Sequence, residues 1–384
     1  MKVLVGNCTF NSGLAIMRSL HSAGAEVVGA DARRLPFNLH SRCSPPYEQI
    51  APAKSADFVD SLVRVLDRHK PDVLLPCGAA QECSQAKDVL SQSTSLLVPD
   101  SDAFSAVHDK RLIVEQCKQS GIRTPELLDV DSGRKLLRSG RVEAIIVKPR
   151  QNFGGGKGVS IVTHVEELDR LKKDIEDRHG EALIAEFVPG PDGGNIAIQV
   201  LFDRYSRLIG HFAQQKVRLY PPRVGISAAG VSIHRADLLQ SILPMFTRLQ
   251  WQGPADIEFK IDSRTGEAWL IEVNARFSGS VGFAIACGVN LPLLSCQAAM
   301  GEELPEATTP VYRAGVKCWS PVMYARAIAA AVRNGESLAS LPAQIYDELH
   351  GERVGNPYRM SDPAPLVGKT LYQIRELFSK PTNA

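Results

Sequence analysis

The stretch "ADIEFKIDSRTGEAWLIEVNARFSGS", Ala255 to Ser280, alternates apolar and polar residues in two runs separated by the segment "SRTGE". Alternation of this kind is typical of β-strands with one buried face, and a five-residue loop containing glycine is typical of a hairpin. If Asp262 faces Ala268 across the loop, Glu258 lies directly opposite Glu272. The stretch therefore predicts a β-hairpin that holds two carboxylates side by side.

The two faces of this hairpin differ in chemistry. The period of two expected of a strand assigns the following residues to the apolar face: Ile257, Phe259, Ile261, Trp269, Ile271 and Val273. The other face is expected to carry Glu258, Lys260, Glu272, Asn274 and Arg276.

Like charges placed opposite each other on neighbouring strands repel. A divalent cation between Glu258 and Glu272 would relieve this repulsion. With Asn274 they form an oxygen-only ligand set that suits Mg²⁺, which keeps waters and takes phosphate oxygens at its other positions. Arg276 would then direct its guanidinium at those phosphates. The alternative is a solvated strand face on which Lys260 pairs with a glutamate.

A second stretch, "VKPRQNFGGGKGVSIV" from Val147 to Val162, combines two lysines with a glycine-rich loop. It does not match a phosphate-binding P-loop, because Gln151 and Gly158 occupy the positions of the first glycine and the hydroxyl residue. It does not match a protein kinase either, since Lys148 precedes the glycines and the later kinase motifs are missing. What remains is a hairpin whose bare backbone can approach phosphate oxygens, with Lys157 at its tip.

Lys148 lies in an apolar strand, where an unpaired charge costs several kcal/mol. It therefore requires an anion. An internal Asp or Glu partner, or a stem that reaches solvent, is the alternative to a bound phosphate.

The order of strand and helix signals divides the chain into three parts. Residues 1–98 alternate strands and helices, which predicts a parallel sheet. Residues 99–305 begin with one helix around 102–121 and continue mainly as strands of an antiparallel sheet. Residues 306–384 are expected to be helix-rich, with helices around 323–335 and 371–379.

The first turn, "GNCTFNSG", lies where a dinucleotide fingerprint would be but lacks its glycine pattern. Asp31 at the end of the second strand could still accept a ribose hydroxyl, so a dehydrogenase on this sheet is one rival hypothesis.

Bulk composition excludes other classes of function. The 384 residues are 44% hydrophobic and 22% charged, with a formal charge of +2, so no general attraction to nucleic acid or to an anionic membrane is expected. The first residues are too short an apolar run for a signal peptide, and no run reaches the length of a membrane span. A cytoplasmic location follows as an expectation. The eight scattered cysteines are expected to be reduced and mostly buried.

Taken together, these residues resemble the ATP-grasp superfamily of carboxylate–amine ligases over about residues 1 to 305. The resemblance implies an α/β chain in which an N-terminal parallel sheet domain precedes an ATP-grasp fold of two α+β subdomains that clasp ATP. It also implies one or two Mg²⁺ ions, with Mn²⁺ as an alternative, on Glu258, Glu272 and Asn274. Small-molecule carboxylate and amine substrates are its implied partners, and assembly into a homo-oligomer is compatible with it.

The resemblance assigns the nucleotide to residues in five segments. By position these are Lys110, Lys148, the flap from Phe153 with Gly154, Gly155, Gly156, Lys157 and Gly158, the hinge Glu186, Phe187 and Val188, and Asp192. Asp192 takes the place of the family's ribose-binding glutamate. Arg276 matches the arginine that steadies an acyl phosphate, and Lys216 and Arg218 are two candidates for one further cation. A strand face with spare basic residues is the alternative for that pair.

The implied reaction transfers a phosphoryl group from ATP to a carboxylate and lets an amine attack the acyl phosphate. Residues at the N-terminal strand ends are candidates for substrate contact, with simple loop capping as the alternative: Asn7, Thr9, Asn11, Gly78 and Glu82. A carboxylase or carbamoyl-phosphate type of enzyme that uses bicarbonate is a rival within the same fold. A nucleotide-binding module without catalysis is another.

Overall fold

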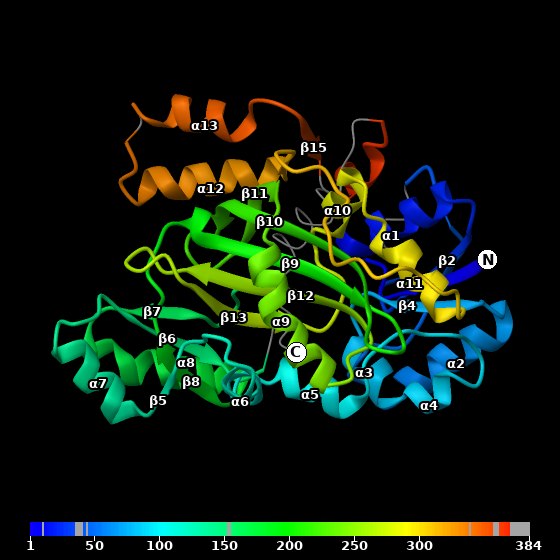
Figure 1. Ribbon diagram of the computed structural model, residues 1–384, viewed down its shortest axis with the longest axis horizontal. Coiled ribbons are helices and arrows are strands. Elements are labelled where there is room, and N and C mark those ends of the chain that lie inside the picture. The colour runs from blue at the N-terminus through cyan, green and yellow to red at the C-terminus, as the bar shows by residue number, and fades with distance from the viewer. Residues whose placement is uncertain are drawn as a thin grey trace.

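The computed structural model describes residues 1–9, 11–34, 41–43, 45–151, 155–337, 339–355 and 361–368. Three β-sheets organise these residues, and helices cover them. In Figure 1 the N-terminal sheet lies at the right in blue, the smallest subdomain lies at the lower left in blue-green, and the large sheet runs between them in green. Each sheet arises from a different sequence pattern.

The N-terminal sheet is parallel and has the strand order β3-β2-β1-β4. Its strands are β1 (Lys2–Gly6), β2 (Glu26–Asp31), β3 (Tyr47–Gln49) and β4 (Val73–Pro76). Its helices are α1 (Asn11–Ser22), α2 (Phe58–His69), α3 (Ala80–Gln85) and α4 (Lys87–Leu90). Short apolar strands separated by helices are typical of such a sheet, because each parallel connection must cross over a face. The predicted parallel sheet is confirmed.

The second sheet has four strands in the order β5-β8-β6-β7, and its measured pairings are antiparallel. Its strands are β5 (Leu127–Leu128), β6 (Ile145–Pro149), β7 (Ser160–Val162) and β8 (Ala182–Glu186). Helices α7 (Val130–Arg138) and α8 (Leu168–His179) pack on one face. On β6, Ile145 and Val147 enter that core, so the alternate residues Ile146 and Lys148 face the opposite way.

The large sheet has seven strands in the order β13-β12-β9-β10-β11-β14-β15. Its strands are β9 (Asn195–Phe202), β10 (Leu208–Tyr220), β11 (Ile226–Ile233), β12 (Gly253–Ile261), β13 (Ala268–Asn274), β14 (Lys317–Trp319) and β15 (Arg353–Gly355). Only β14 and β15 pair in parallel, and the other pairings are antiparallel.

The remaining helices bind this sheet to its neighbours. They are α5 (Ser101–His108), α6 (Leu112–Gln119), α9 (Ala236–Arg248), α10 (Val281–Cys287), α11 (Leu291–Ala299), α12 (Pro321–Arg333) and α13 (Leu341–Leu349). One core joins α5, α6 and α9 to one face of the sheet. Another joins the other face, through Phe212 and Phe283, to α10, α11 and the N-terminal sheet. The N-terminal and large sheets are therefore fixed against each other by shared apolar burial.

One expectation about this architecture is wrong. The helix predicted around 102–121 is two helices, because Asp109 interrupts it and its Oδ1 accepts the backbone N–H groups of Arg111 and Leu112 at 2.8 and 3.3 Å. In the C-terminal part, the helix predicted around 323–335 is confirmed by α12, and β14 and β15 extend the large sheet. Its other predicted helix, around 371–379, lies outside the described residues. The proposed division at residues 98 and 305 stays a prediction.

Within the described residues, no helix by itself has the length and hydropathy of a membrane span, although α10 and α11, which meet at a 97° bend, would pass as a pair on length and composition.

Candidate active site

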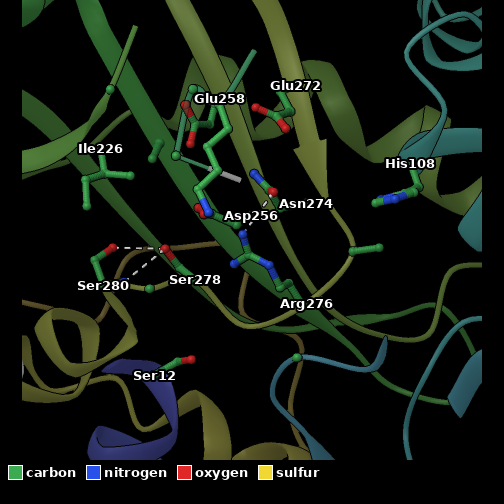
Figure 2. A pocket seen from close by; sticks show the side chains of 18 of the residues that line it. Ser12, His108, Ile226, Asp256, Glu258, Glu272, Asn274, Arg276, Ser278 and Ser280 are labelled. Atoms are coloured by element: carbon green, nitrogen blue, oxygen red, sulfur yellow. Dashed lines mark hydrogen bonds between the residues drawn. The ribbon is translucent and has the colours of Figure 1, made fainter. Parts of the chain in front are cut away.

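A large cleft, of about 1700 Å³, opens where the three sheets face one another. Its walls come from the glycine hairpin of β6 and β7, from one face of β9 to β13, and from the strand ends of the N-terminal sheet. Figure 2 shows Asp256, Glu258, Glu272, Asn274 and Arg276 converging in it. The acidic hairpin and the glycine-rich hairpin thus line the same cavity.

The acidic hairpin has the predicted pairing of carboxylates but reaches it differently. Ile261, not Asp262, pairs with Ala268, which would place Glu258 one residue out of register with Glu272. An irregularity between Glu258 and Phe259 restores the pair, because Ile271 is an extra residue on β13. Glu258 and Glu272 are therefore directly opposite each other.

The same bulge changes the apolar face that alternation predicted for β13. Leu270 and Val273 are fully buried in the core, whereas Trp269 is half-buried and Ile271 lines the cleft. Strict alternation had placed Trp269, Ile271 and Val273 together. That assignment is wrong because one inserted residue exchanges the faces on either side of it.

The carboxylates of the cleft interact strongly. Burial, and then the charge of Glu258, raise the pKa of Glu272. Lys216 is the nearest counter-charge, with its Nζ 2.6 Å from Oε2 of Glu258. The alternative in which Lys260 pairs with a glutamate is not what forms, since Lys260 Nζ donates to the carbonyl of Pro191 at 2.5 Å. The sheet thus holds Glu258 and Glu272 opposite each other, and Lys216, not Lys260, is the lysine that pairs with Glu258.

The donor chemistry of this group fits a divalent cation bound in part by the protein. Glu258, Glu272 and Asn274 offer only oxygen donors, as hard cations require. Asn274 Oδ1 accepts from Arg276 Nη2 at 3.1 Å, so its oxygen is held on the same side of the cleft as the two carboxylates. Across the described ranges, no three His, Cys, Asp or Glu side chains form a complete metal centre. Phosphate oxygens or water would have to complete the coordination.

Two lysines face the carboxylates across the cleft, Lys148 from β6 and Lys110 from the break between α5 and α6. Lys148 is 9% exposed, and burial, followed by the charge of Lys110, lowers its pKa to about 8. Burial also lowers the pKa of Lys110, which the break between α5 and α6 presents to the cleft. Glu272 opposes both shifts, so it lies within electrostatic reach of both ammonium groups. These cations are poorly compensated and suit an added anion.

The structure separates the two cations predicted on β10. Lys216 lines the cleft, but Arg218 does not. Arg218 instead donates to Glu348 of α13 at 2.7 Å and to Gln344 at 3.0 Å. The register shifts between Lys216 and Arg218, so they do not share a face as alternation requires. The structure therefore does not place Arg218 among the residues that could act on a ligand in the cleft.

The hinge residues Glu186, Phe187 and Val188 line the cleft as a group. Glu186 Oε2 accepts the backbone N–H of Glu126 at 3.3 Å. The guanidinium of Arg223 lies 4.7 Å from the ring centroid of Phe187, which packs the loop between β10 and β11 against this hinge.

Asp192, the predicted ribose ligand, has a different task. Its two carboxylate oxygens accept the backbone N–H groups of Leu219 and Arg223, each at 2.9 Å. It does not line the cleft. Because both oxygens are engaged in fixing the loop after β10, the structure does not support the nucleotide-binding assignment of Asp192.

The glycine hairpin rests on that same loop. Gly155, Gly156 and Gly158 all have positive φ values, between 64° and 73°. A Cβ on Gly156 would lie 2.1 Å from the carbonyl oxygen of Val224, so only glycine permits this approach. Gly155, Gly156 and exposed Lys157 line the cleft, whereas Gly158 does not. Phe153 and Gly154 lie outside the described residues.

The N-terminal sheet contributes to the opposite wall. Of the five candidates there, Thr9, Asn11, Gly78 and Glu82 line the cleft, and Asn7 does not. Thr9 Oγ1 donates to Asp31 Oδ2 at 2.6 Å, and the Thr9 N–H donates to the same oxygen at 3.0 Å. Asp31 therefore caps the first turn and is not presented to a ribose.

Two residues that line the cleft, His108 and Asp256, were not predicted from the sequence. His108 faces Arg276 across the cleft in Figure 2, and burial, then the charges of Lys110 and Arg276, lower its pKa to about 4. Asp256 precedes Glu258 by two residues on β12, and burial, then Glu258, raise its pKa to about 6. The period of two could have found Asp256, because residues 256, 258 and 260 share a face. Nothing in the sequence marks His108.

Comparisons with known proteins agree with this architecture. The family model "ATP-grasp in the biosynthetic pathway with Ter operon" matches residues 222–319, which contain the acidic hairpin. The dimeric biotin carboxylase domain of 2-oxoglutarate carboxylase from Hydrogenobacter thermophilus, solved with MgADP, ADP and bicarbonate, is similar with a TM-score of 0.65 at 17% identity. That match covers 82% of this chain and 73% of the other. The chain has an ATP-grasp fold.

Curated relatives of this ATP-grasp chain are distant in sequence. A D-aspartate ligase from Enterococcus faecium is 24% identical over 265 residues, which is 62% of each protein. The large chain of carbamoyl phosphate synthase from Clostridium beijerinckii is 26% identical over 265 residues, which is 64% of this chain and 24% of that one. The chain thus spans less than two thirds of the length of these relatives. The predicted resemblance is confirmed at the level of the fold.

Proposed function

We propose that this protein is an ATP-dependent carboxylate–amine ligase that forms an amide or peptide bond and releases ADP and phosphate. The observation that carries the proposal is the opposition of Glu258 and Glu272 to Lys148 and Lys110 across one cleft. Opposed carboxylates and buried lysines are each costly alone, and a metal–polyphosphate complex compensates both at once. The ligase named among the relatives and the MgADP in the structural neighbour support this interpretation.

Glu258, Glu272 and Asn274 are the residues that would hold Mg²⁺. When bound, the metal supplies charge neutralisation on the phosphates, with one or two ions and with Mn²⁺ as a substitute. If Glu258 bound the metal, its salt bridge with Lys216 would weaken, and the Lys216 ammonium group would remain close to the phosphates.

The other residues position the substrates. Lys148, Lys110 and the glycine hairpin bind the phosphates, and the hinge of Glu186 to Val188 receives the base. Arg276, held by the carbonyl of Phe277 at 3.0 Å and by Asn274, steadies the carboxylate as it accepts the phosphoryl group. The work of the protein in phosphoryl transfer is positioning and charge stabilisation.

Each step balances. A carboxylate oxygen forms a bond to the γ-phosphorus while the bond from that phosphorus to the β-phosphate oxygen breaks, which leaves ADP. The amine nitrogen then forms a bond to the acyl carbon, phosphate departs with the bridging oxygen, and the nitrogen loses a proton to solvent or phosphate. The hairpin from Gly155 to Gly158 lies where it would keep water from the acyl phosphate.

The direct test measures ADP release from Mg-ATP over panels of amino acids, hydroxy acids and dicarboxylates, each with and without amines. We expect one acid to support ADP release that an amine accelerates, with a product of the mass of an amide. Glu272→Ala serves as the inactive control. Absence of Mg-dependent ATP binding in the wild-type protein would reject the proposal.

The carbamoyl phosphate synthase and the bicarbonate-bound neighbour favour one second candidate, an enzyme that activates bicarbonate. The same assay separates the two. ADP release that requires bicarbonate and no other acid would support the second candidate instead of the ligase.

A further inference from the structure

The side chain of His108 lines the cleft at the last residue of α5. It is half-buried, and its ring lies against Phe104, one turn earlier on the same helix, with the two ring centroids 5.0 Å apart. Figure 2 shows it facing Arg276 across the cleft. Among the described residues, no group forms a hydrogen bond or an ion pair with this imidazole. One ring nitrogen of a neutral imidazole is an acceptor, so His108 offers an acceptor to a ligand in the cleft.

The charged groups that act on His108 are mostly cations. They are Lys54 from the segment before α2, Lys110 and Asp109 from the break between α5 and α6, and Arg276 from the segment after β13. The anion among them, Asp109, is already engaged, because its carboxylate accepts from Arg150 Nε at 2.6 Å and from two backbone N–H groups. Burial and the cations therefore keep the imidazole neutral, with a pKa of about 4.

Bound phosphates would change this balance of charge. Lys110 and Arg276 are two of the residues proposed to hold the phosphates and the reacting carboxylate, so substrates would compensate the charges that keep His108 neutral. The pKa of the ring would then rise toward the ordinary value of 6.5. The imidazole would thus be a stronger base in the substrate complex than in the free protein.

The second step of the ligase reaction needs a proton acceptor, since the amine nitrogen must lose a proton as the amide forms. The carboxylates of the acidic hairpin are less suited to this task, because Glu258 is paired with Lys216 and Glu272 is assigned to the metal. Glu82 of α3 also lines the cleft. A negative carboxylate there would repel an acyl phosphate, whereas a neutral imidazole does not.

We infer that His108 is the catalytic base of the amine-dependent step. The amine nitrogen bonds to the acyl carbon held at Arg276, and the unprotonated ring nitrogen of His108 takes a proton from that nitrogen. An electron pair on the former carbonyl oxygen then restores the C=O bond, the bond from the acyl carbon to the bridging oxygen breaks, and phosphate departs. The imidazolium passes its proton to phosphate or solvent. The inference rests on the proposed ligase function and adds a residue to its second step.

The test uses two amines that differ in their need for a base. The addition product of methylamine, a strongly basic amine, holds its proton tightly, whereas that of the weakly basic hydroxylamine loses its proton readily to water. Amide formation from each amine is measured with the acid that supports ADP release, and single-turnover ADP formation is measured without amine. The variants are His108→Gln and His108→Ala. His164→Gln is the matched control, because His164 is exposed and does not line the cleft.

We expect His108→Gln to lower kcat with methylamine about 10²-fold and kcat with hydroxylamine less than about threefold, with amine-free ADP formation unchanged within about twofold. Imidazole added to His108→Ala should restore the methylamine reaction. The rescue should be greater above about pH 7 than below it, because the neutral form of imidazole is the base.

Equal losses with the two amines, or a parallel loss of amine-free ADP formation, would overturn the assignment of His108 as a base. An intact methylamine reaction in His108→Gln, together with its loss in Glu82→Gln, would also overturn it and transfer the role to Glu82. No ADP formation by the wild-type protein with any acid would instead overturn the ligase function, and the base with it.

Discussion

The two hairpins that face each other across the cleft differ in what they present to a ligand. The β12–β13 hairpin fixes charged groups, and its carboxylates stand on strands paired on one side by β9 and backed by a full apolar core. The β6–β7 hairpin supplies bare backbone, and its three described flap glycines have positive φ. The charged groups thus stand on paired strands over an apolar core, whereas the phosphate-facing hairpin offers backbone without side chains in the way.

The largest effect is expected on the β12–β13 hairpin. Glu272→Ala should lower turnover by at least about 10³-fold, because the substitution removes a metal ligand and leaves Glu258 without its partner in binding. Thermal unfolding should change little, since burial and Glu258 disfavour the charge that is removed. Steady-state ADP release and a melting curve measure the two.

Glu267→Ala, in the turn of the same hairpin, is the matched control for that substitution. Glu267 pairs with Arg123 at 2.7 Å outside the cleft. Equal losses of activity in the two variants would show that the hairpin is only a structural element.

Substitution of Lys148 tests the role of the positive charge that faces the β12–β13 hairpin. Lys148→Met should weaken ATP binding about 10²-fold, because a charge-assisted contact to phosphate is lost in a low-dielectric site. It should also leave the melting temperature unchanged or raised, since the buried ammonium destabilises the free protein. Isothermal titration with ATP and Mg²⁺, together with calorimetry, checks both. A lower melting temperature with intact ATP affinity would assign Lys148 a structural role.

The pH dependence of ATP binding follows from the same residue. With a pKa of about 8 in the free protein, Lys148 is charged below that value and neutral above it, so affinity should fall as pH rises through 8. Between pH 7 and 9 the loss should reach about tenfold. Stability changes in the opposite sense, because the unfolded chain keeps this proton up to about pH 10.4 and the fold gains stability from pH 8 upward. Lys148→Arg, which stays charged, should flatten the affinity profile.

The features that could be predicted from the sequence are those that depend on regular secondary structure. The alternation in Ala255–Asn274 is enough to place Glu258 and Glu272 on one face, and the helix–strand order is enough for the parallel sheet. Those patterns reflect burial, which dominates the choice of secondary structure. The fold class was therefore accessible, and so was the pairing of the carboxylates.

The incorrect assignments of side chains to strand faces occurred where a single residue is inserted in a strand. The bulge at Ile271 and the register shift next to Arg218 are tertiary features without a local sequence signal. Asp192 is misassigned for a related reason, since its backbone acceptors come from a loop that sequence alone cannot bring near it. Long-range pairing decides these positions, and hydrophobic periodicity carries no information about it.

The glycine hairpin is tested at Gly156. Gly156→Ala should raise the KM for ATP about tenfold, because its Cβ would overlap the carbonyl of Val224 and push the hairpin off the loop after β10. Gly266→Ala is the control, since its φ of 73° carries the same backbone strain with no atom within 4 Å of the added Cβ. Similar KM values for the two variants would show that the contact with Val224 does not position the flap.

The smallest effect on chemistry is expected outside the cleft, at Arg218. Arg218→Met removes the partner of Glu348 and Glu336 and should cost about 3 kcal/mol of stability, because the Arg218 and Glu348 side chains are only 10% and 12% exposed. Its effect on kcat/KM should stay within about threefold. Lys216→Met should do the reverse, lowering kcat/KM at least about 10²-fold by leaving Glu258 without its counter-charge. If Arg218→Met were inactive and Lys216→Met active, the C-terminal helix that binds Arg218 would belong to the active site. The site would then extend beyond the cleft residues to α13.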